Sequence, residues 1–273
     1  MNRHFAELGD VWKHLPLAEI LRINPPRHVW ETHAGSASYP LTENPTRLHG
    51  ALRFLREASG DPVLENCTYL QVLRSLPGNY LGSPALATHL LGTSASYIFC
   101  DVDRQSIATL QAVTAGLNAD VFEADGVSTI LREAQNRHLD PGGVLVHIDP
   151  FDPGERFTTE SKTPLELAAW LANAGYRVFY WYGYDAIEQR GWAREAISKL
   201  ANGVELWCGD VVMPASFVFP ERTGAWGCGV VLANMTRTET RVCAALGTAL
   251  EGISESDVVR NNNPPGVSFR VLA

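Results

Sequence analysis

Residues 97–126 have the sequence YIFCDVDRQSIATLQAVTAGLNADVFEADG, and this stretch decides the fold. It begins with an apolar run, Tyr97–Asp101, continues with a helical pattern over residues 104–116, and returns to a second run, Val121–Ala124. Apolar runs without polar alternation are typical of strands that are buried on both faces. A strand, a helix and a strand in this order predict two parallel strands joined by a crossover helix.

The same alternation extends over most of the chain. Further strands are predicted at His28–His33, Val144–Ile148, Tyr176–Tyr182, Val204–Cys208 and Gly227–Asn234, and further helices at residues 10–22, 46–58, 84–91, 126–137, 164–174, 185–201 and 238–252. The predicted fold class is therefore α/β, a mostly parallel, Rossmann-like sheet with helices on both faces. Only a turn-rich loop separates the last two strands, which predicts an antiparallel pair at one end of the sheet.

The stretch of residues 41–80 interrupts the alternation between the first two strands. It contains two helical patterns, Arg47–Leu55 and Tyr69–Leu76, which Pro, Gly and Asn residues separate. A length of 273 residues suits one large domain that carries an insert. We therefore expect a single domain over residues 1–273 with a small helical insert at residues 41–80.

Composition excludes several classes of protein. The chain has 22 Lys and Arg residues against 30 Asp and Glu residues, and the net charge of −8 excludes a generally basic coat for nucleic acid. The five cysteines are odd in number and form no C-x-x-C motif, which indicates reduced core residues. The histidines show no metal-ligand spacing, so we expect no metal. Without a signal-peptide pattern or an 18-residue apolar run, we expect a cytoplasmic protein that contacts no membrane.

Candidate ligand-binding residues follow the predicted strands, since open α/β sheets bind ligands beyond the carboxyl ends of their strands. Gly35 lets a ligand approach the backbone closely, and Asp101 can hold ribose hydroxyls. Asp103 is better explained as a helix N-cap. Asp125 either binds the exocyclic amine of a purine or caps the next helix, and the sequence leaves both interpretations open.

The fourth strand ends in Asp149-Pro150, which puts a carboxylate next to a fixed backbone carbonyl. Such a pair can hold an amine that is to be alkylated, although an Asp-Pro pair can also simply end a strand. The chain has neither G-x-G-x-x-G nor a P-loop motif. These strand ends therefore favour S-adenosylmethionine (SAM) over nucleotides that carry a phosphate chain.

Five short motifs occur in one order along residues 3–235. They are Gly9-Asp10-Val11-Trp12-Lys13-His14, Thr32-His33-Ala34-Gly35 with Tyr39 four residues on, Gly82-Ser83-Pro84, Ala124-Asp125-Gly126 and Ile148-Asp149-Pro150. In order and spacing this set resembles the RlmJ-type family of 23S ribosomal RNA adenine-N6 methyltransferases. The resemblance implies a class I SAM-dependent methyltransferase fold, and it also implies a helical insert after the first strand.

The resemblance also implies roles for individual residues. It puts His14, His33 and Ser83 near the methionine side of SAM, with Gly35 in the same loop, Asp101 on the ribose, and Asp125 and Gly126 on the adenine ring. It makes Asp149 the catalytic acidic residue, with Pro150 beside it. On the substrate side we expect Lys13, His4 and Phe151. No metal is implied.

The acceptor of the methyl group stays open. The family's tetrapeptide D-P-P-Y, whose aromatic fourth residue stacks on the flipped base, is Asp149-Pro150-Phe151-Asp152 here. Two acceptors follow: adenine in ribosomal RNA or a related nucleic acid, and a small-molecule amine such as a natural-product intermediate. A non-catalytic SAM- or RNA-binding module is a third hypothesis, against which the intact Asp149-Pro150 argues. Tyr180–Tyr182 (YWY) suits core packing, with base stacking as the alternative. The sequence does not predict the oligomeric state.

Overall fold

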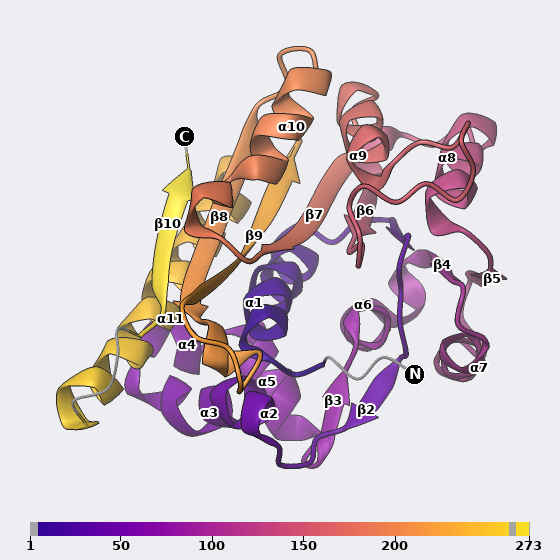
Figure 1. Cartoon of the computed structure of the whole chain (residues 1–273). Helices are drawn as coiled ribbons and strands as arrows, with labels where there is room; N and C mark the ends of the chain where they lie inside the picture. The colour runs from indigo at the N-terminus through magenta and orange to yellow at the C-terminus, as the bar shows by residue number, and fades with distance from the viewer. Residues whose placement is uncertain (1–4, 262–265, 273) are drawn as a thin grey trace.

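The computed structural model describes residues 5–261 and 266–272, which form a doubly wound α/β sheet (Figure 1). The sheet has the strand order β10-β8-β9-β7-β6-β1-β4-β5. The mutually parallel strands are β1 (His28–Glu31), β4 (Ser96–Asp101), β5 (Ala119–Glu123), β6 (Val144–Ile148) and β7 (Arg177–Tyr184). The remaining strands are β8 (Leu206–Pro214), β9 (Ala225–Ala233) and β10 (Ser268–Leu272). The predicted fold class is confirmed.

The direction in which strands are added to the sheet reverses at β1. From β1 the chain adds β4 and then β5 on one side, and it later adds β6 and β7 on the other side. Such a reversal opens a crevice at the carboxyl edge of an α/β sheet. Beyond β7, β9 runs antiparallel to both β7 and β8, as the sequence predicts for the last two strands of the alternation. The C-terminal β10 adds one further antiparallel strand outside β8.

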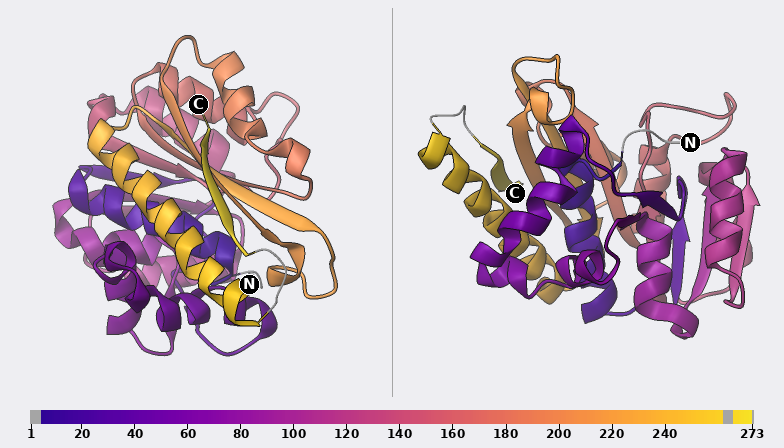
Figure 2. Two further views of the ribbon diagram at one scale, coloured as in Figure 1. Left: turned by 90° about the vertical axis from the view of Figure 1, so that its left-hand side faces the viewer. Right: turned by 90° about the horizontal axis from the view of Figure 1, so that it is seen from below.

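Helices cover both faces of the sheet (Figure 2). One face carries α1 (Leu8–Ile23), α6 (Ser83–Leu91), α7 (Arg104–Val113) and α11 (Arg237–Asn261), and the other carries α8 (Gly126–Asn136), α9 (Pro164–Asn173) and α10 (Trp192–Leu200). Each face has its own cluster of buried apolar side chains. Short 3-10 helices lie at Ala58–Gly60, Gly92–Ser94, Pro141–Gly143, Ile187–Gln189 and Ala215–Phe217. Within the described ranges, no helix has the length and apolar character needed to cross a membrane.

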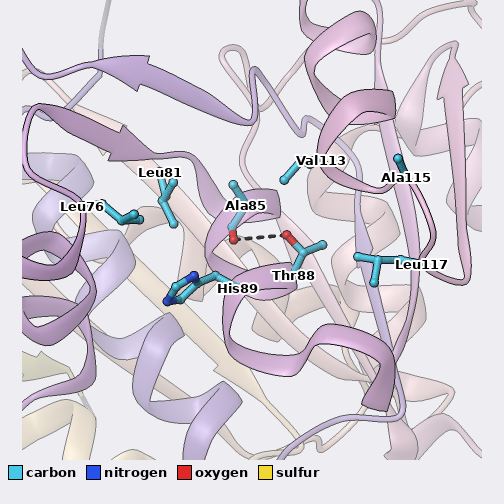
Figure 3. Close-up of a pocket in the computed structure, with 8 residues that line it drawn as sticks. All are labelled: Leu76, Leu81, Ala85, Thr88, His89, Val113, Ala115 and Leu117. Carbon is cyan, nitrogen blue, oxygen red and sulfur yellow. Dashed lines mark hydrogen bonds between the residues drawn. The ribbon is translucent and has the colours of Figure 1, made fainter.

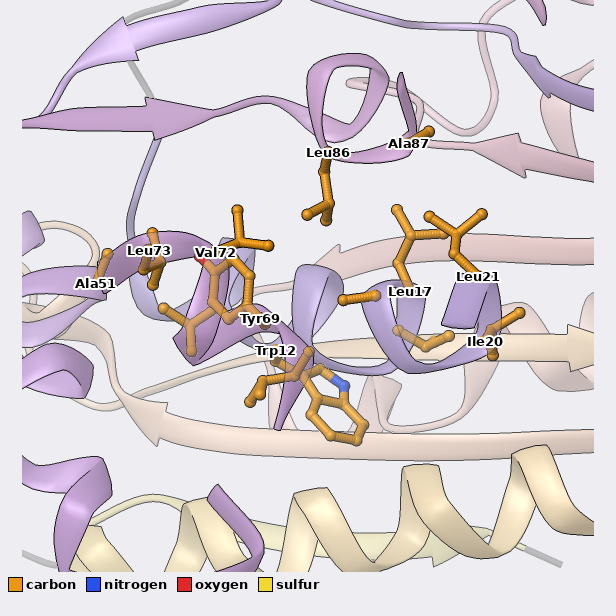
Figure 4. Packing of buried hydrophobic residues seen from close by; sticks show 14 of the residues in the cluster. Trp12, Leu17, Ile20, Leu21, Ala51, Tyr69, Val72, Leu73, Leu86 and Ala87 are labelled. Carbon is orange, nitrogen blue, oxygen red and sulfur yellow. The ribbon is translucent and has the colours of Figure 1, made fainter. Parts of the chain in front are cut away.

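Helix α1 lies at the centre of the first cluster (Figure 4). It packs against α6 and α11, and also against α5 of the insert described below. Almost every side chain from Leu8 to Leu21 is buried. The buried polar side chains Lys13, His14 and Glu19 have hydrogen-bond or ion-pair partners. The Trp12 indole donates a hydrogen bond to the Gly209 carbonyl of β8, with an N–O distance of 3.3 Å. This packing fixes α1, and with it the first sequence motif, against the sheet.

The insert consists of short helices, α2 (Pro45–His49), α3 (Ala51–Glu57), α4 (Pro62–Glu65) and α5 (Thr68–Ser75), between two paired strands, β2 (Ser38–Pro40) and β3 (Asn79–Leu81). The helix expected over residues 46–58 is broken at Gly50. A Cβ at Gly50 would lie 2.2 Å from the Ala6 carbonyl oxygen, so the chain needs glycine there. The paired strands were not predicted, because three residues are too few to show a periodicity.

Three other predicted boundaries differ from the structure by more than three residues. The helix expected over residues 185–201 begins only at Trp192, because β7 continues to Tyr184 and Gly191 has a left-handed φ of +76°. The strand expected at Val204–Cys208 is β8, which extends to Pro214. The helix expected over residues 238–252 is α11, which continues to Asn261. The five cysteines are buried and unpaired, as predicted.

Candidate functional site

A cavity of about 110 Å³ lies at the carboxyl edge of the sheet, where β1, β4 and β5 end. Four of the residues that the sequence singles out line it: His33, Asp101, Asp125 and Gly126. The loop between β6 and α9 supplies further lining residues, Glu155, Phe157 and Lys162. Three strand ends that are far apart in the sequence therefore meet at one cavity, next to the point at which the strand order reverses.

Asp101 joins two of these strand ends. Its Oδ2 accepts a hydrogen bond from the Gly35 amide at 2.7 Å, and its Oδ1 accepts one from the Asp103 amide at 2.8 Å. Gly35 has a φ of +66°, and a Cβ there would lie 3.1 Å from the Tyr39 hydroxyl. A carboxylate has about four acceptor positions, so Asp101 can hold these amides and still accept ribose hydroxyls.

The residues after β4 and β5 begin the next helices. Asp103 caps α7 by accepting hydrogen bonds from the amides of Gln105 and Ser106, as the sequence predicts. Asp125 caps α8, since its Oδ2 accepts a hydrogen bond from the Ser128 amide at 2.8 Å. The capping interpretation of Asp125 is therefore confirmed, and its contact with an adenine ring stays a prediction.

Gly126 packs more closely against its neighbours than Gly35, the other glycine among the predicted site residues. A Cβ at Gly126 would lie 1.8 Å from the Thr32 carbonyl oxygen, which is a backbone atom that cannot move aside cheaply. Only glycine therefore allows the start of α8 to touch the loop after β1. This contact closes one wall of the cavity.

Beside the cavity, Lys13 forms ion pairs with two carboxylates. Its Nζ lies 2.7 Å from Asp149 Oδ2 and 2.9 Å from Asp10 Oδ1, and the Lys13 and Asp149 side chains are 10% and 19% exposed. Burial by itself lowers the pKa of Lys13, but the charges of Asp149 and Asp10 outweigh it and raise the pKa. Burial raises the pKa of Asp149, but Lys13 and two nearby histidines lower it by more. The pKa of Asp149 is therefore below its ordinary value. Both groups are therefore charged at neutral pH.

Behind this pair lies a group that we call the buried polar cluster: His14, Glu31, Tyr80, Ser83 and His147. Ser83 donates a hydrogen bond to Glu31 Oε2 at 2.6 Å, and His147 Nδ1 lies 3.1 Å from the same oxygen. The Tyr80 hydroxyl lies 2.6 Å from His14 Nδ1. Burial, followed by the charge of Lys13, lowers the pKa of His14 well below its ordinary value.

Three atoms of the buried polar cluster have no hydrogen-bond partner within the described part of the chain. They are His14 Nε2, Glu31 Oε1 and His147 Nε2. Buried polar atoms are normally paired, and an unpaired one costs about 1–3 kcal/mol. An ordered water or a polar ligand beside the cluster would satisfy these atoms.

His33 lines the cavity, and its charge interaction with Asp149 links the cavity to the ion pair. Its Nδ1 lies 2.7 Å from the Thr32 hydroxyl. Burial lowers the pKa of His33, although the charges of Asp149 and Asp101 partly oppose the shift. Pro150 is buried, whereas the next residue, Phe151, is 98% exposed. The remaining predicted site residue, His4, lies outside the described residues.

Sequence reasoning missed several polar groups around this site. Asp10, Glu31 and His147 had no assigned role. Asp10 pairs with Lys13, Glu31 accepts a hydrogen bond from Ser83, and His147 contacts Glu31 and interacts through charge with Asp149. The available signal was an ionisable side chain within or directly after an apolar strand, as in VLVHI and HVWETH. Among the described residues, no group of three or more His, Cys, Asp or Glu residues has a geometry that could hold a metal ion.

A second cavity, of about 330 Å³, lies away from this site between α5, β3, α6 and α7 (Figure 3). Its lining is mainly apolar, with Leu76, Leu81 and Leu117 among the residues, and His89 at one side. None of the described site residues lines this cavity. It therefore has no part in the site at the carboxyl edge.

Comparison with known proteins gives a fold relationship. A solved structure of a DUF519-family protein from Legionella pneumophila superposes with a TM-score of 0.69 at 19% identity, covering 99% of this chain and 98% of that chain. An Agrobacterium tumefaciens SAM-dependent methyltransferase gives a TM-score of 0.44 at 10% identity, covering 82% of this chain and 61% of that chain. A DUF574-family protein from Streptomyces avermitilis gives 0.41 at 11% identity, covering 82% of each chain. No protein-family model and no curated protein sequence matches the chain. The first likeness shows a shared fold, and the other two are too low to argue from.

Proposed function

We propose that this chain is a SAM-dependent methyltransferase that methylates an amine nitrogen, with N6 of adenine in 23S ribosomal RNA or a related nucleic acid as the favoured acceptor. The observation that carries the proposal is the convergence of His33, Asp101 and Asp125-Gly126 on one cavity, next to the Lys13–Asp149 pair. These residues belong to separate parts of the sequence. The strand order brings these strand ends to one edge of the sheet, and the cavity that forms between them gives a ligand a place to bind.

The side chains that line the cavity, together with the buried polar cluster outside its lining, fit SAM, which has an adenosine at one end and a charged amino acid at the other. Asp101 would accept the ribose hydroxyls, and Asp125 and Gly126 would contact the adenine ring. At the other end, Glu31 Oε1 can accept from an ammonium group, and His14 Nε2 can bind a carboxylate if it carries the proton. Ser83 and His147 hold Glu31 in place through its other oxygen.

When bound, SAM supplies a methyl group on a sulfonium centre that an amine can attack. An aromatic amine is a weak nucleophile because its lone pair is delocalised into the ring. The Asp149 carboxylate and the Pro150 carbonyl would accept its N–H groups, favour the pyramidal nitrogen and stabilise the positive charge that develops on it. Lys13 acts as a positioning residue, because its ion pair fixes Asp149 Oδ2 and lowers the Asp149 pKa. The proton that the methylated nitrogen loses would leave through water, since a carboxylate with a lowered pKa is a weak base.

The surroundings of Asp149 support a nucleobase as acceptor. Phe151 is 98% exposed two residues from Asp149, so its ring is free to stack on a base. Taking a base out of an RNA stack costs a few kcal/mol, and an aromatic contact offsets part of this cost. The small-molecule alternative rests on Asp152, an exposed carboxylate beside Phe151, and on the net charge of −8, both of which repel phosphates.

The test is transfer of a tritiated methyl group from SAM to naked 23S ribosomal RNA and, in parallel, to a cell metabolite extract. We expect label in the RNA. Asp149→Ala should abolish transfer while calorimetry still shows SAM binding. Label only in the extract would select the small-molecule acceptor, and full turnover by Asp149→Ala would remove Asp149 from its role. RNA binding through phosphates should weaken steeply with salt.

A further inference from the structure

Two tryptophans lie beside the reaction centre on the α1 face of the sheet. Tyr180 of β7 is the register partner of Ile148 of β6, so Trp181 lies level with Asp149. β9 runs antiparallel to β7, and its second residue, Trp226, therefore also lies near the carboxyl edge. The centroids of the two indole rings are 6.5 Å apart, with an interplanar angle of 38°. We call Trp181 and Trp226 the tryptophan shelf.

Glycines let both rings pack directly on the backbone. A Cβ at Gly183, two residues after Trp181, would lie 3.0 Å from the Trp226 ring. A Cβ at Gly9 in α1 would lie 3.2 Å from Trp226 and 3.6 Å from Trp181. A larger side chain at either position would push against the rings. Both indoles stay only partly buried, at the margin of the first core cluster.

The tryptophan shelf is joined to the reaction centre by one side chain. Lys13 Nζ lies 5.5 Å from the Trp181 ring centroid and 2.7 Å from Asp149 Oδ2. In addition, Trp181 Nε1 is shielded from solvent and has no hydrogen-bond partner in the described part of the chain. Buried indole N–H groups normally find an acceptor, so this donor points to a polar ligand atom nearby.

We propose that the tryptophan shelf is the acceptor subsite and that it takes a planar heteroaromatic amine, namely a base of single-stranded nucleic acid. This inference rests on the proposed function. The base stacks on the indoles, which are sequence-tolerant stacking surfaces. Trp181 Nε1 donates to a ring nitrogen or carbonyl oxygen of the base. In addition to the exposed Phe151 ring, the shelf thereby supplies an aromatic surface in place of the one that the related tetrapeptide has at its fourth residue, where this chain has Asp152.

The test uses a fluorescently labelled oligoadenylate, with binding followed by anisotropy in saturating S-adenosylhomocysteine so that the cofactor cavity is blocked. Loss of the binding free energy of one stacked base should make Trp226→Leu bind the oligonucleotide about 5- to 150-fold more weakly. Trp226→Phe, which keeps a ring, should stay within about threefold of wild type. Trp181→Phe keeps the ring but removes the N–H, and we expect an intermediate loss. Trp170→Leu is the matched control, because Trp170 is a partly buried tryptophan that packs on the other face.

Each variant is checked for folding by thermal melting and for S-adenosylhomocysteine binding by calorimetry. The proposed subsite is supported if Trp226→Leu binds the oligonucleotide more weakly but binds S-adenosylhomocysteine as the wild type does. It is overturned if a folded Trp226→Leu binds the oligonucleotide normally, or if wild type does not bind it. A wild type that fails to bind S-adenosylhomocysteine refutes the proposed function instead, while the oligonucleotide series, repeated without it, still tests the shelf.

Discussion

Replacing Lys13 by methionine removes the cation between Asp10 and Asp149 while keeping an unbranched side chain of similar length. Lys13 Nζ lies 2.9 Å and 2.7 Å from the two carboxylates, and its side chain is only 10% exposed. Removing one partner of a buried ion pair costs about 3–5 kcal/mol, and an exposed pair is worth about 0–1 kcal/mol. Because Asp149 is 19% exposed and can be partly hydrated, we expect Lys13→Met to lower the free energy of unfolding by about 2–4 kcal/mol at pH 7.

The effect should depend on pH in a defined direction. The pKa of Asp149 is lowered in the folded state, so its contribution is present above its unfolded pKa, about 3.9, and is lost as pH falls through the folded value. The pKa of Lys13 is raised, so its contribution is present below its unfolded pKa, about 10.4, and is lost as pH rises through the folded value. The coupling between the two should therefore be constant from about pH 5 to pH 9 and shrink in acid below about pH 4.

The assay is urea unfolding, followed by tryptophan fluorescence, of wild type, Lys13→Met, Asp149→Asn and the double variant. We expect a coupling energy of about 1–3 kcal/mol between Lys13 and Asp149 at pH 7, because Asp10 still holds Lys13 when Asp149 is neutralised. Exposed Arg27→Met serves as the control, since its pair with Asp140 is about two-thirds exposed on both sides. A coupling energy below about 0.5 kcal/mol, or one that does not change in acid, would show that Lys13 and Asp149 do not form a buried ion pair.

Three further outcomes follow from the site. Gly126→Ala should destabilise the chain by several kcal/mol, at least about 2, and lower SAM affinity in calorimetry, because its Cβ would lie 1.8 Å from the Thr32 carbonyl oxygen; an unchanged melting temperature would contradict the packing. Asp101→Ala should weaken SAM binding about 5- to 150-fold, and equal affinities would remove Asp101 from the cofactor site. Phe151→Ala should leave stability within about 0.5 kcal/mol, since the ring is 98% exposed, but slow methyl transfer to RNA; normal transfer would exclude Phe151 from the acceptor site.

Most of the sheet could be predicted from the sequence because its central strands are continuous apolar runs, whereas the edge strand β10 was not predicted and the other edge strand, β5, is only partly buried. YIFCD and VLVHI are buried along most of their length, and burial on both faces leaves a pattern that composition alone reveals. The strands β2 and β3 could not be found this way, because each has three residues and forms through pairing across the insert. The break at Gly50 depends on a backbone contact with Ala6, which is a tertiary effect that no local pattern encodes.

The candidate site was predictable where strand ends determine it. Asp101, Asp125 and Asp149 each follow an apolar run, so the topology alone brings them to one edge of the sheet. The buried polar cluster was harder to predict from the sequence, because Glu31 and His147 lie inside strands and look like ordinary strand residues. Only the folded structure brings their side chains together. The tryptophan shelf depends on the register between β6, β7 and β9, which the sequence does not specify.

The most direct test of the central claim is a crystal structure of the chain with S-adenosylhomocysteine bound. We expect the ligand in the cavity at the carboxyl edge, with its ribose hydroxyls on Asp101, its adenine beside Asp125 and Gly126, and its sulfur directed toward Asp149. Ligand bound in the apolar cavity near His89, or with its ribose away from Asp101, would contradict the proposed cofactor site.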